Sequence, residues 1–117
     1  MYVDLEKLKD LHSRGEVFAH NEGPPPEVVI QLFETNHQIW RAELLGSPNQ
    51  SGPPKFSIPF VEARERAGVH LSDQDLRNTI TILGDYFYAC DAIKIQAGQA
   101  FSGLRNNRPP LIFLWWD

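Results

Sequence analysis

Apolar residues at the start of the chain recur at the spacing of an amphipathic α-helix. They are Val3, Leu5, Leu8 and Leu11. Charged residues separate them and Gly15 can end the helix, so the pattern predicts a short helix over residues 3–14. Residues 16–20 are typical of a brief extended segment, which the proline-rich loop of residues 21–26 brings to an end.

The segment between Pro26 and Gly46 has the boundary residues of a second helix. Proline is favoured in the first turn of a helix, and glycine just beyond the last turn. The apolar side chains that would share one side of this helix are Val28, Val29, Leu32, Phe33, Ile39, Trp40 and Leu44. A hairpin over residues 27–45 is the alternative, because residues 40–44 alternate between apolar and polar as strand residues do.

Residues 46–54 are rich in glycine, serine, asparagine and proline, which indicates a surface loop. After this loop, apolar residues return at Phe56, Ile58 and Phe60, and we expect all three in the core. A short helix is expected over residues 60–67.

Residues Ser72 to Asp75 resemble a capping box, in which a serine and an acidic residue three positions later cap a helix start together. Apolar residues then follow at spacings of three and four positions. They are Leu76, Ile80, Leu83, Phe87 and Cys90. This pattern predicts a helix over residues 73–98. A hairpin over residues 79–96 is the alternative, because Gly84-Asp85 is a good turn between β-branched and aromatic residues.

Six consecutive apolar residues, from Leu111 to Trp116, lie at the end of the sequence. Burial of each side chain is worth about 2 kcal/mol, so the run carries roughly 10 kcal/mol, comparable to the net stability of a small domain. We expect a strand here, with residues 16–20 as one candidate partner. Alternation would send Ile112, Leu114 and Trp116 to one face and Phe113 and Trp115 to the other. Because both faces are apolar, a second subunit is expected to cover part of the strand.

These elements predict one domain over residues 1–117 that is mainly α, with three or four helices and a minor sheet of short strands. The alternative fold class is α+β, with hairpins at residues 27–45 and 79–96.

The composition of the chain argues against several classes of function. The net charge of −4 gives no broad positive field, which argues against nucleic-acid binding. The single cysteine, Cys90, excludes an internal disulfide and a Cys-rich zinc site and fits a reducing compartment. No secretory signal pattern or membrane-length apolar run is present, so we expect a cytoplasmic protein with no membrane partner.

No pattern of catalytic residues stands out. Glu34 and His37 have the spacing of half a di-iron site, but the chain has no second such pair, so no metal or other cofactor is expected. Cys90 would lie on the apolar stripe of a helix, where a thiol is inert. The sequence therefore favours a protein that is not an enzyme, although it does not exclude catalysis.

Two further binding hypotheses rest on local patterns. Arg105 and Arg108 flank two asparagines in a loop and could hold a carboxylate or a phosphate. The aromatic residues that could stack on such a small anionic ligand or nucleotide are Tyr86, Tyr88 and Phe101. Residues 61–77 loosely resemble a helix-turn-helix DNA-binding module, but acidic residues in the first turn of its second helix would be repelled by DNA.

We expect a non-catalytic module for protein–protein interaction, acting as an adaptor, an inhibitor or an assembly subunit. Aromatic residues often dominate interface energies, and here they gather towards the end of the chain. The predicted interface, through which the chain would also self-associate as a homo-oligomer, consists of Ile112, Phe113, Leu114, Trp115 and Trp116.

Overall fold

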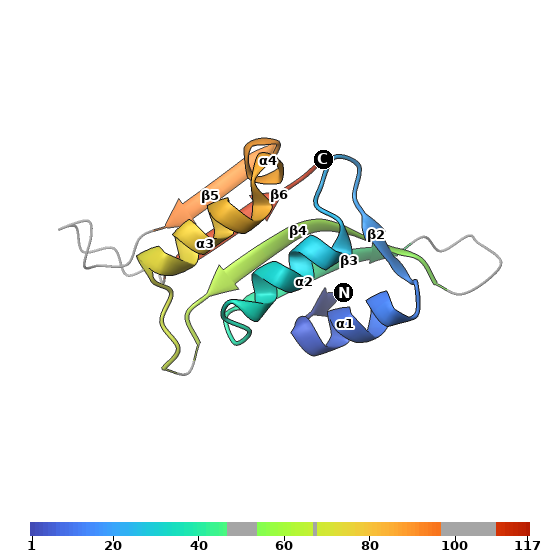
Figure 1. Cartoon of the computed structure of the whole chain (residues 1–117), viewed down its shortest axis with the longest axis horizontal. Helices are drawn as coiled ribbons and strands as arrows, with labels where there is room; N and C mark the ends of the chain where they lie inside the picture. The colour runs from blue at the N-terminus through green and yellow to red at the C-terminus, as the bar shows by residue number, and fades with distance from the viewer. Residues whose placement is uncertain (47–53, 67, 97–109) are drawn as a thin grey trace.

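A computed structural model describes residues 1–46, 54–66, 68–96 and 110–117 of the protein. Within these residues, six strands form one sheet and four helices pack along one of its faces (Figure 1). The strands are β1 (Tyr2–Val3), β2 (Val17–Ala19), β3 (Trp40–Gly46), β4 (Phe56–Arg64), β5 (Ala92–Gln96) and β6 (Leu111–Trp115). The helices are α1 (Leu5–Ser13), α2 (Pro26–Glu34), α3 (Asp73–Leu83) and α4 (Asp85–Tyr88).

Strand β4 is the centre of the sheet. The strand order is β1-β3-β4-β6-β5, and β2 also pairs with β4. One edge of β4 meets β3. The other edge meets β2 in parallel over residues 56–58 and β6 in antiparallel over residues 60–64, so β2 and β6 follow one another along it. All pairs except β2 with β4 are antiparallel.

A bulge in β4 separates these two pairings. Glu43 pairs with Phe60 and Leu45 with Ser57, so two residues of β4 oppose one residue of β3. One of those two residues is Pro59, which has no backbone N–H to donate and is tolerated at a bulge. The bulge reverses which residues face the helices: Ile58 is buried before it, whereas Phe60 points to the opposite face after it. The expectation that Phe60 joins the core is therefore wrong.

The helix predicted over residues 3–14 is confirmed for residues 5–13, whereas Val3 belongs to β1, and the short strand after it is confirmed. Asp4 caps α1 by accepting a hydrogen bond from the backbone N–H of Lys7 at 3.0 Å. The apolar stripe of the helix is buried against the sheet and α2 at Leu5, Leu8 and Leu11. Strand β2 follows directly, within the extended segment predicted at residues 16–20.

The capping box is also confirmed, but the helix that it starts is shorter than predicted. The Ser72 hydroxyl accepts from the N–H of Asp75 at 3.3 Å, and the Asp75 carboxylate accepts from the N–H of Ser72 at 2.7 Å. Helix α3 ends at Leu83 because Gly84 turns the chain at a φ of +54°, a conformation that favours glycine. One turn of helix, α4, and strand β5 occupy residues 85–96 in place of the helix predicted over residues 73–98, whose last two residues lie outside the described part.

The prediction of a mainly α fold is wrong, because the protein is α+β. Helix α2 stops at Glu34 and residues 40–46 form a strand, so neither a helix over residues 26–46 nor a hairpin over 27–45 is present. The helix predicted over residues 60–67 is also wrong, because residues 60–64 belong to β4. Nor is there a hairpin over residues 79–96. The class of the alternative prediction, α+β, is right, although both of its hairpins are wrong.

The physical reason is that the same apolar spacings fit both periodicities. Trp40 and Leu44 are four residues apart, which suits a helix face, but with Ala42 they also form one face of a strand. Pairing with β4 from Trp40 to Gly46, interrupted only at the bulge, gives β3 its backbone partners and stabilises the strand instead of a helix.

The C-terminal run forms β6, as expected, but between β4 and β5 rather than beside residues 16–20. Its alternation is as predicted: Ile112, Leu114 and Trp116 are buried under the helices. The Trp116 backbone N–H donates to the carbonyl of Pro59 at 2.8 Å, and its indole Nε1 donates to the carbonyl of Tyr86 at 3.0 Å. The chain therefore covers one face of this strand by itself.

Replacing Leu114 by Ala is expected to lower the free energy of unfolding by about 2–5 kcal/mol, because this fully buried side chain leaves a cavity between the sheet and the helices. The matched control is Ile93→Ala. Ile93 pairs with Leu114 in register but is 43% exposed, so its loss should cost about 1 kcal/mol. Urea denaturation measures both. Equal losses for the two variants would contradict the placement of the core.

Candidate functional site: the open face of the sheet

The helices cover one face of the sheet, and the pairing register defines which side chains lie on the other face. Residues paired directly across neighbouring strands share a face. The side chains on the face opposite the helices, here called the open face, include Tyr2, Arg41, Glu43, Phe60, Glu62, Arg64, Ala92, Lys94, Leu111, Phe113 and Trp115. Before the bulge in β4, the same register adds Phe18, Leu45 and Ser57.

Aromatic rings from three strands touch one another on the open face. The Tyr2 and Phe60 rings meet edge to face with centroids 6.0 Å apart, and Phe60 and Phe113 are 4.9 Å apart. Trp115 is the direct neighbour of Phe60 across the β4–β6 pair. Tyr2 is exposed and the other three residues are partly exposed. The open face therefore presents a row of aromatic groups that the fold does not cover completely.

A buried carboxylate between two arginines lies next to this row. The Glu62 side chain is only 4% exposed and forms ion pairs with Arg41 and, at 3.4 Å, with Arg64. The guanidinium of Arg41 also stacks over the Tyr2 ring, 4.0 Å from its centroid. Two cations compensate one buried anion here, so Glu62 restrains both guanidinium groups.

The charge that reaches solvent on the open face is positive. The carboxylates of Glu62 and Glu43 are largely covered, and Glu43 also contacts the terminal amine of Met1 at 2.7 Å. In contrast, the Arg64 side chain is 46% exposed and Lys94 is exposed. The face thus combines aromatic surface with exposed cations, although the whole chain has a net charge of −4.

Only part of the predicted interface lies on the open face. Ile112, Leu114 and Trp116 are used by the core of the chain itself, whereas Phe113 and Trp115 are partly exposed. The structure adds residues that sequence reasoning missed. They are Tyr2, Arg41, Phe60, Glu62 and Arg64. For Phe60, Glu62 and Arg64, the sequence signal was their position at every second residue, as in a strand. The prediction of a helix over residues 60–67 did not take this alternation into account.

The predicted anionic-ligand site is not assembled within the described residues. Arg105, Arg108 and Phe101 lie outside them. Tyr86 and Tyr88 belong to α4, on the helix side of the sheet: Tyr86 packs against the core, and Tyr88 is 75% exposed with its ring against Phe87.

The structure contradicts the geometry on which two other hypotheses depended, the Glu34 and His37 metal pair and the helix-turn-helix. Helix α2 ends at Glu34, so Glu34 and His37 do not share a helical face. In the parts of the chain that the structure describes, no group of three or more metal-ligating side chains could hold a metal ion. The first helix of the supposed helix-turn-helix is replaced by the end of β4, because Val61–Arg64 is a strand.

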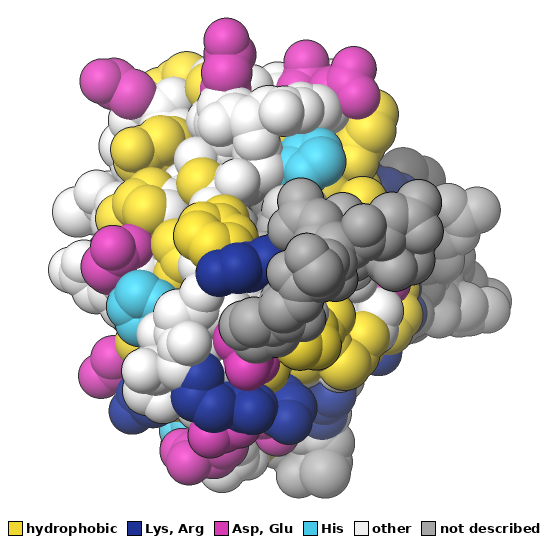
Figure 2. Space-filling view, turned by 90° about the vertical axis from the view of Figure 1, so that its right-hand side faces the viewer, with side chains coloured by type: hydrophobic (Ala, Val, Ile, Leu, Met, Phe, Trp, Pro, Cys, Tyr) yellow, Lys and Arg dark blue, Asp and Glu magenta, His cyan; other side chains and the backbone are white. Residues whose placement is uncertain are grey.

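A hollow of about 200 Å³ lies where β3 ends and β4 begins. It is lined by Phe18, Leu45, Gly46, Lys55, Phe56 and Ser57. The Lys55 ammonium lies 4.8 Å from the centroid of the Phe18 ring. Figure 2 views this end of the molecule and shows hydrophobic side chains beside Lys and Arg groups, with acidic side chains both next to these groups and at the margins. The lining residues flank residues 47–53, which lie outside the described part.

Comparison with known protein families, curated proteins and solved structures finds no match to this chain. Among the described helices, the longest has 11 residues, and none has the length and apolar character needed to cross a membrane.

We predict that Arg41 and Arg64 are coupled through Glu62. Each single change to Met should cost about 1 kcal/mol, since the remaining arginine still compensates the carboxylate, whereas the double variant should cost about 3 kcal/mol or more. Urea denaturation of the four proteins in this double-mutant cycle gives the coupling energy. Additive costs would show that the two arginines act independently.

Cys90 should react slowly with alkylating reagents. Burial raises the pKa of the Cys90 thiol from 9.0 to about 11, and the negative charge of Asp91 adds to the shift. Because the thiolate is the nucleophile, the rate with iodoacetamide at pH 8 should be about a hundredfold below that of the urea-unfolded chain. The rate in the folded protein should keep rising above pH 9. A folded protein that reacts as fast as the unfolded chain would contradict this assignment.

Proposed function

We propose that this protein is a non-catalytic binding module that docks another protein on the open face of its sheet. The observation that supports the proposal is the contact row of Tyr2, Phe60 and Phe113 beside two arginines held by Glu62. Aromatic and arginine side chains contribute most to protein–protein affinity, and side chains that are already fixed lose little entropy on binding.

Charge complementarity favours a partner with acidic groups around an apolar or aromatic centre. Arg64 and Lys94 are exposed on the open face, whereas its carboxylates are mostly covered. A second copy docked face to face would place cations opposite cations, which costs binding energy. We therefore propose a different protein as the occupant, with self-association through Phe113 and Trp115 as the alternative. We also propose a cytoplasmic location, which the lone free cysteine supports.

The test uses a phage-displayed library of random peptides selected on the whole protein. Peptides that combine acidic and aromatic residues should be enriched. Their affinity should fall at least about tenfold in Trp115→Ser, because interface tryptophans are often worth 2 kcal/mol or more. Arg64→Glu, which changes an exposed charge, should weaken the same peptides. Tyr88→Ser is the matched control, since this exposed aromatic residue lies on the helix side and should leave binding unchanged.

Thermal melts followed by circular dichroism confirm that each variant is folded before its affinity is compared. The proposal would be refuted if no peptide is enriched on the wild-type protein, or if the enriched peptides bind Trp115→Ser and Arg64→Glu with unchanged affinity. A dimer in sedimentation analysis that Trp115→Ser dissociates would instead identify a second copy as the occupant. Tight binding of a single-stranded oligonucleotide, lost in the same variants, would replace a protein partner by a nucleic acid, because bases also stack on aromatic side chains.

A further inference from the structure

A hollow of about 340 Å³ lies where the start of α1 meets the β1 edge of the sheet. It is lined by Tyr2, Val3, Asp4, Lys7, Arg41 and Arg66. Three of these six residues are cations and one is an anion, so the lining is locally positive in a protein whose net charge is −4. The residues come from three separate parts of the chain, and only the fold brings them together.

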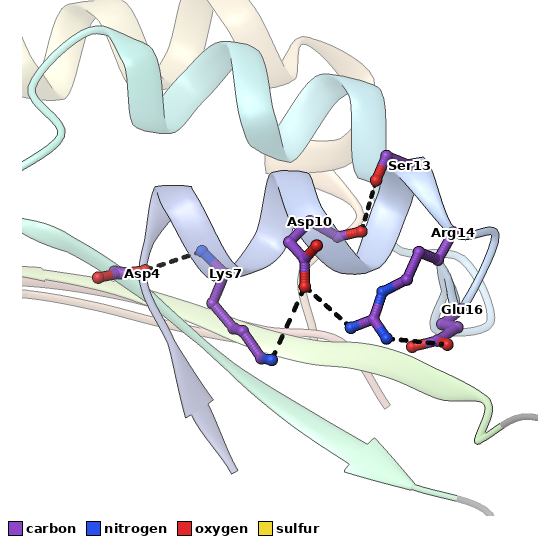
Figure 3. A network of polar contacts seen from close by, with 6 residues as sticks. All are labelled: Asp4, Lys7, Asp10, Ser13, Arg14 and Glu16. Atoms are coloured by element: carbon purple, nitrogen blue, oxygen red, sulfur yellow. Dashed lines mark hydrogen bonds and ion pairs between the residues drawn. The ribbon is translucent and has the colours of Figure 1, made fainter.

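The single carboxylate of the lining already has a structural task. Asp4 caps α1 by accepting the backbone N–H of Lys7 at 3.0 Å (Figure 3). This hydrogen bond involves the backbone of Lys7 and leaves the ammonium group uncompensated by Asp4. The helix cap therefore accounts for the presence of Asp4 in an otherwise cationic hollow.

The cations of the lining are only partly compensated. The Lys7 ammonium lies 3.8 Å from the Asp10 carboxylate, a distance too long for a hydrogen bond. Asp10 also accepts a hydrogen bond from the guanidinium of Arg14 at 2.9 Å (Figure 3). Arg66 is exposed and has no ion-pair partner among the residues that the structure describes. Arg41 shares Glu62 with Arg64, so it adds positive charge to the hollow as well.

We infer that this hollow binds an oxyanion, a phosphate or carboxylate group. A guanidinium group holds two oxygens of such a group in parallel, and an ammonium adds a point charge, so Arg66, Arg41 and Lys7 supply matching donors. The volume lies at the lower end of the range for small-molecule sites. The anion can belong to a small molecule or to a side chain of a docked protein, because Tyr2 and Arg41 also belong to the open face. The inference does not depend on the proposed docking function.

The test is a titration of the ¹⁵N-labelled protein with inorganic phosphate, at an ionic strength held constant with sodium chloride. Amide shifts are expected to concentrate at residues 2–7 and around Arg41 and Arg66. Arg66→Gln and Lys7→Gln should each raise the dissociation constant about tenfold, the effect of losing one charge-assisted hydrogen bond. The matched controls are Arg77→Gln on α3 and Lys9→Gln on α1, two exposed cations outside the hollow, which should leave it unchanged.

Shifts that are absent, spread evenly over the surface, or insensitive to Arg66→Gln and Lys7→Gln would overturn the inference. A second titration with a phosphoserine peptide distinguishes the two sources of the anion. If the peptide binds more tightly than inorganic phosphate and Trp115→Ser removes the gain, the anion belongs to a docked protein. Equal affinities that Trp115→Ser leaves unchanged identify a small-molecule site. Absent phosphate binding by a wild-type protein that still enriches peptides overturns only this inference, and phosphate binding by a wild-type protein that enriches no peptides refutes only the docking proposal.

Discussion

Strand β4 is the element on which the rest of the structure depends, because it pairs with three other strands. Its hydrogen bonds join β3 on one edge and both β2 and β6 on the other. The bulge beside Pro59 allows this division, since it lies where the pairing with β2 ends and the pairing with β6 begins. Without β4, the N-terminal and C-terminal strands would have no common partner.

The helices pack on one face of this sheet, and the composition of the open face follows from that constraint. Every second side chain of β3, β4 and β6 must face away from the core. In this chain those positions carry aromatic residues and arginines, together with two glutamates that are largely covered. Glu62 is compatible with this surface because two guanidinium groups compensate its buried charge. The aromatic row and the cationic hollow at its edge are thus consequences of one arrangement.

Local signals predicted the elements whose stability is mostly local. The stripe of α1 and the capping box at Ser72 depend on residues within one or two turns, and both were recognised in the sequence. The alternation in β6 was also recognised, which placed Phe113 and Trp115 on the face opposite the core strand residues. The remainder of the candidate site was missed because Tyr2, Arg41 and Phe60 belong to strands far apart in sequence, and two of those strands had been interpreted as helices.

The sequence by itself determined the buried stripe of α1, the start of α3, and the alternation of the C-terminal strand. Tertiary structure alone decided that residues 40–46 and 56–64 are strands, because their apolar spacing suits both periodicities and the strand partners, including each other, are distant in sequence. It also decided which side of each strand meets water. That choice depends on the register and on the bulge in β4, which are properties of paired strands and of no single segment.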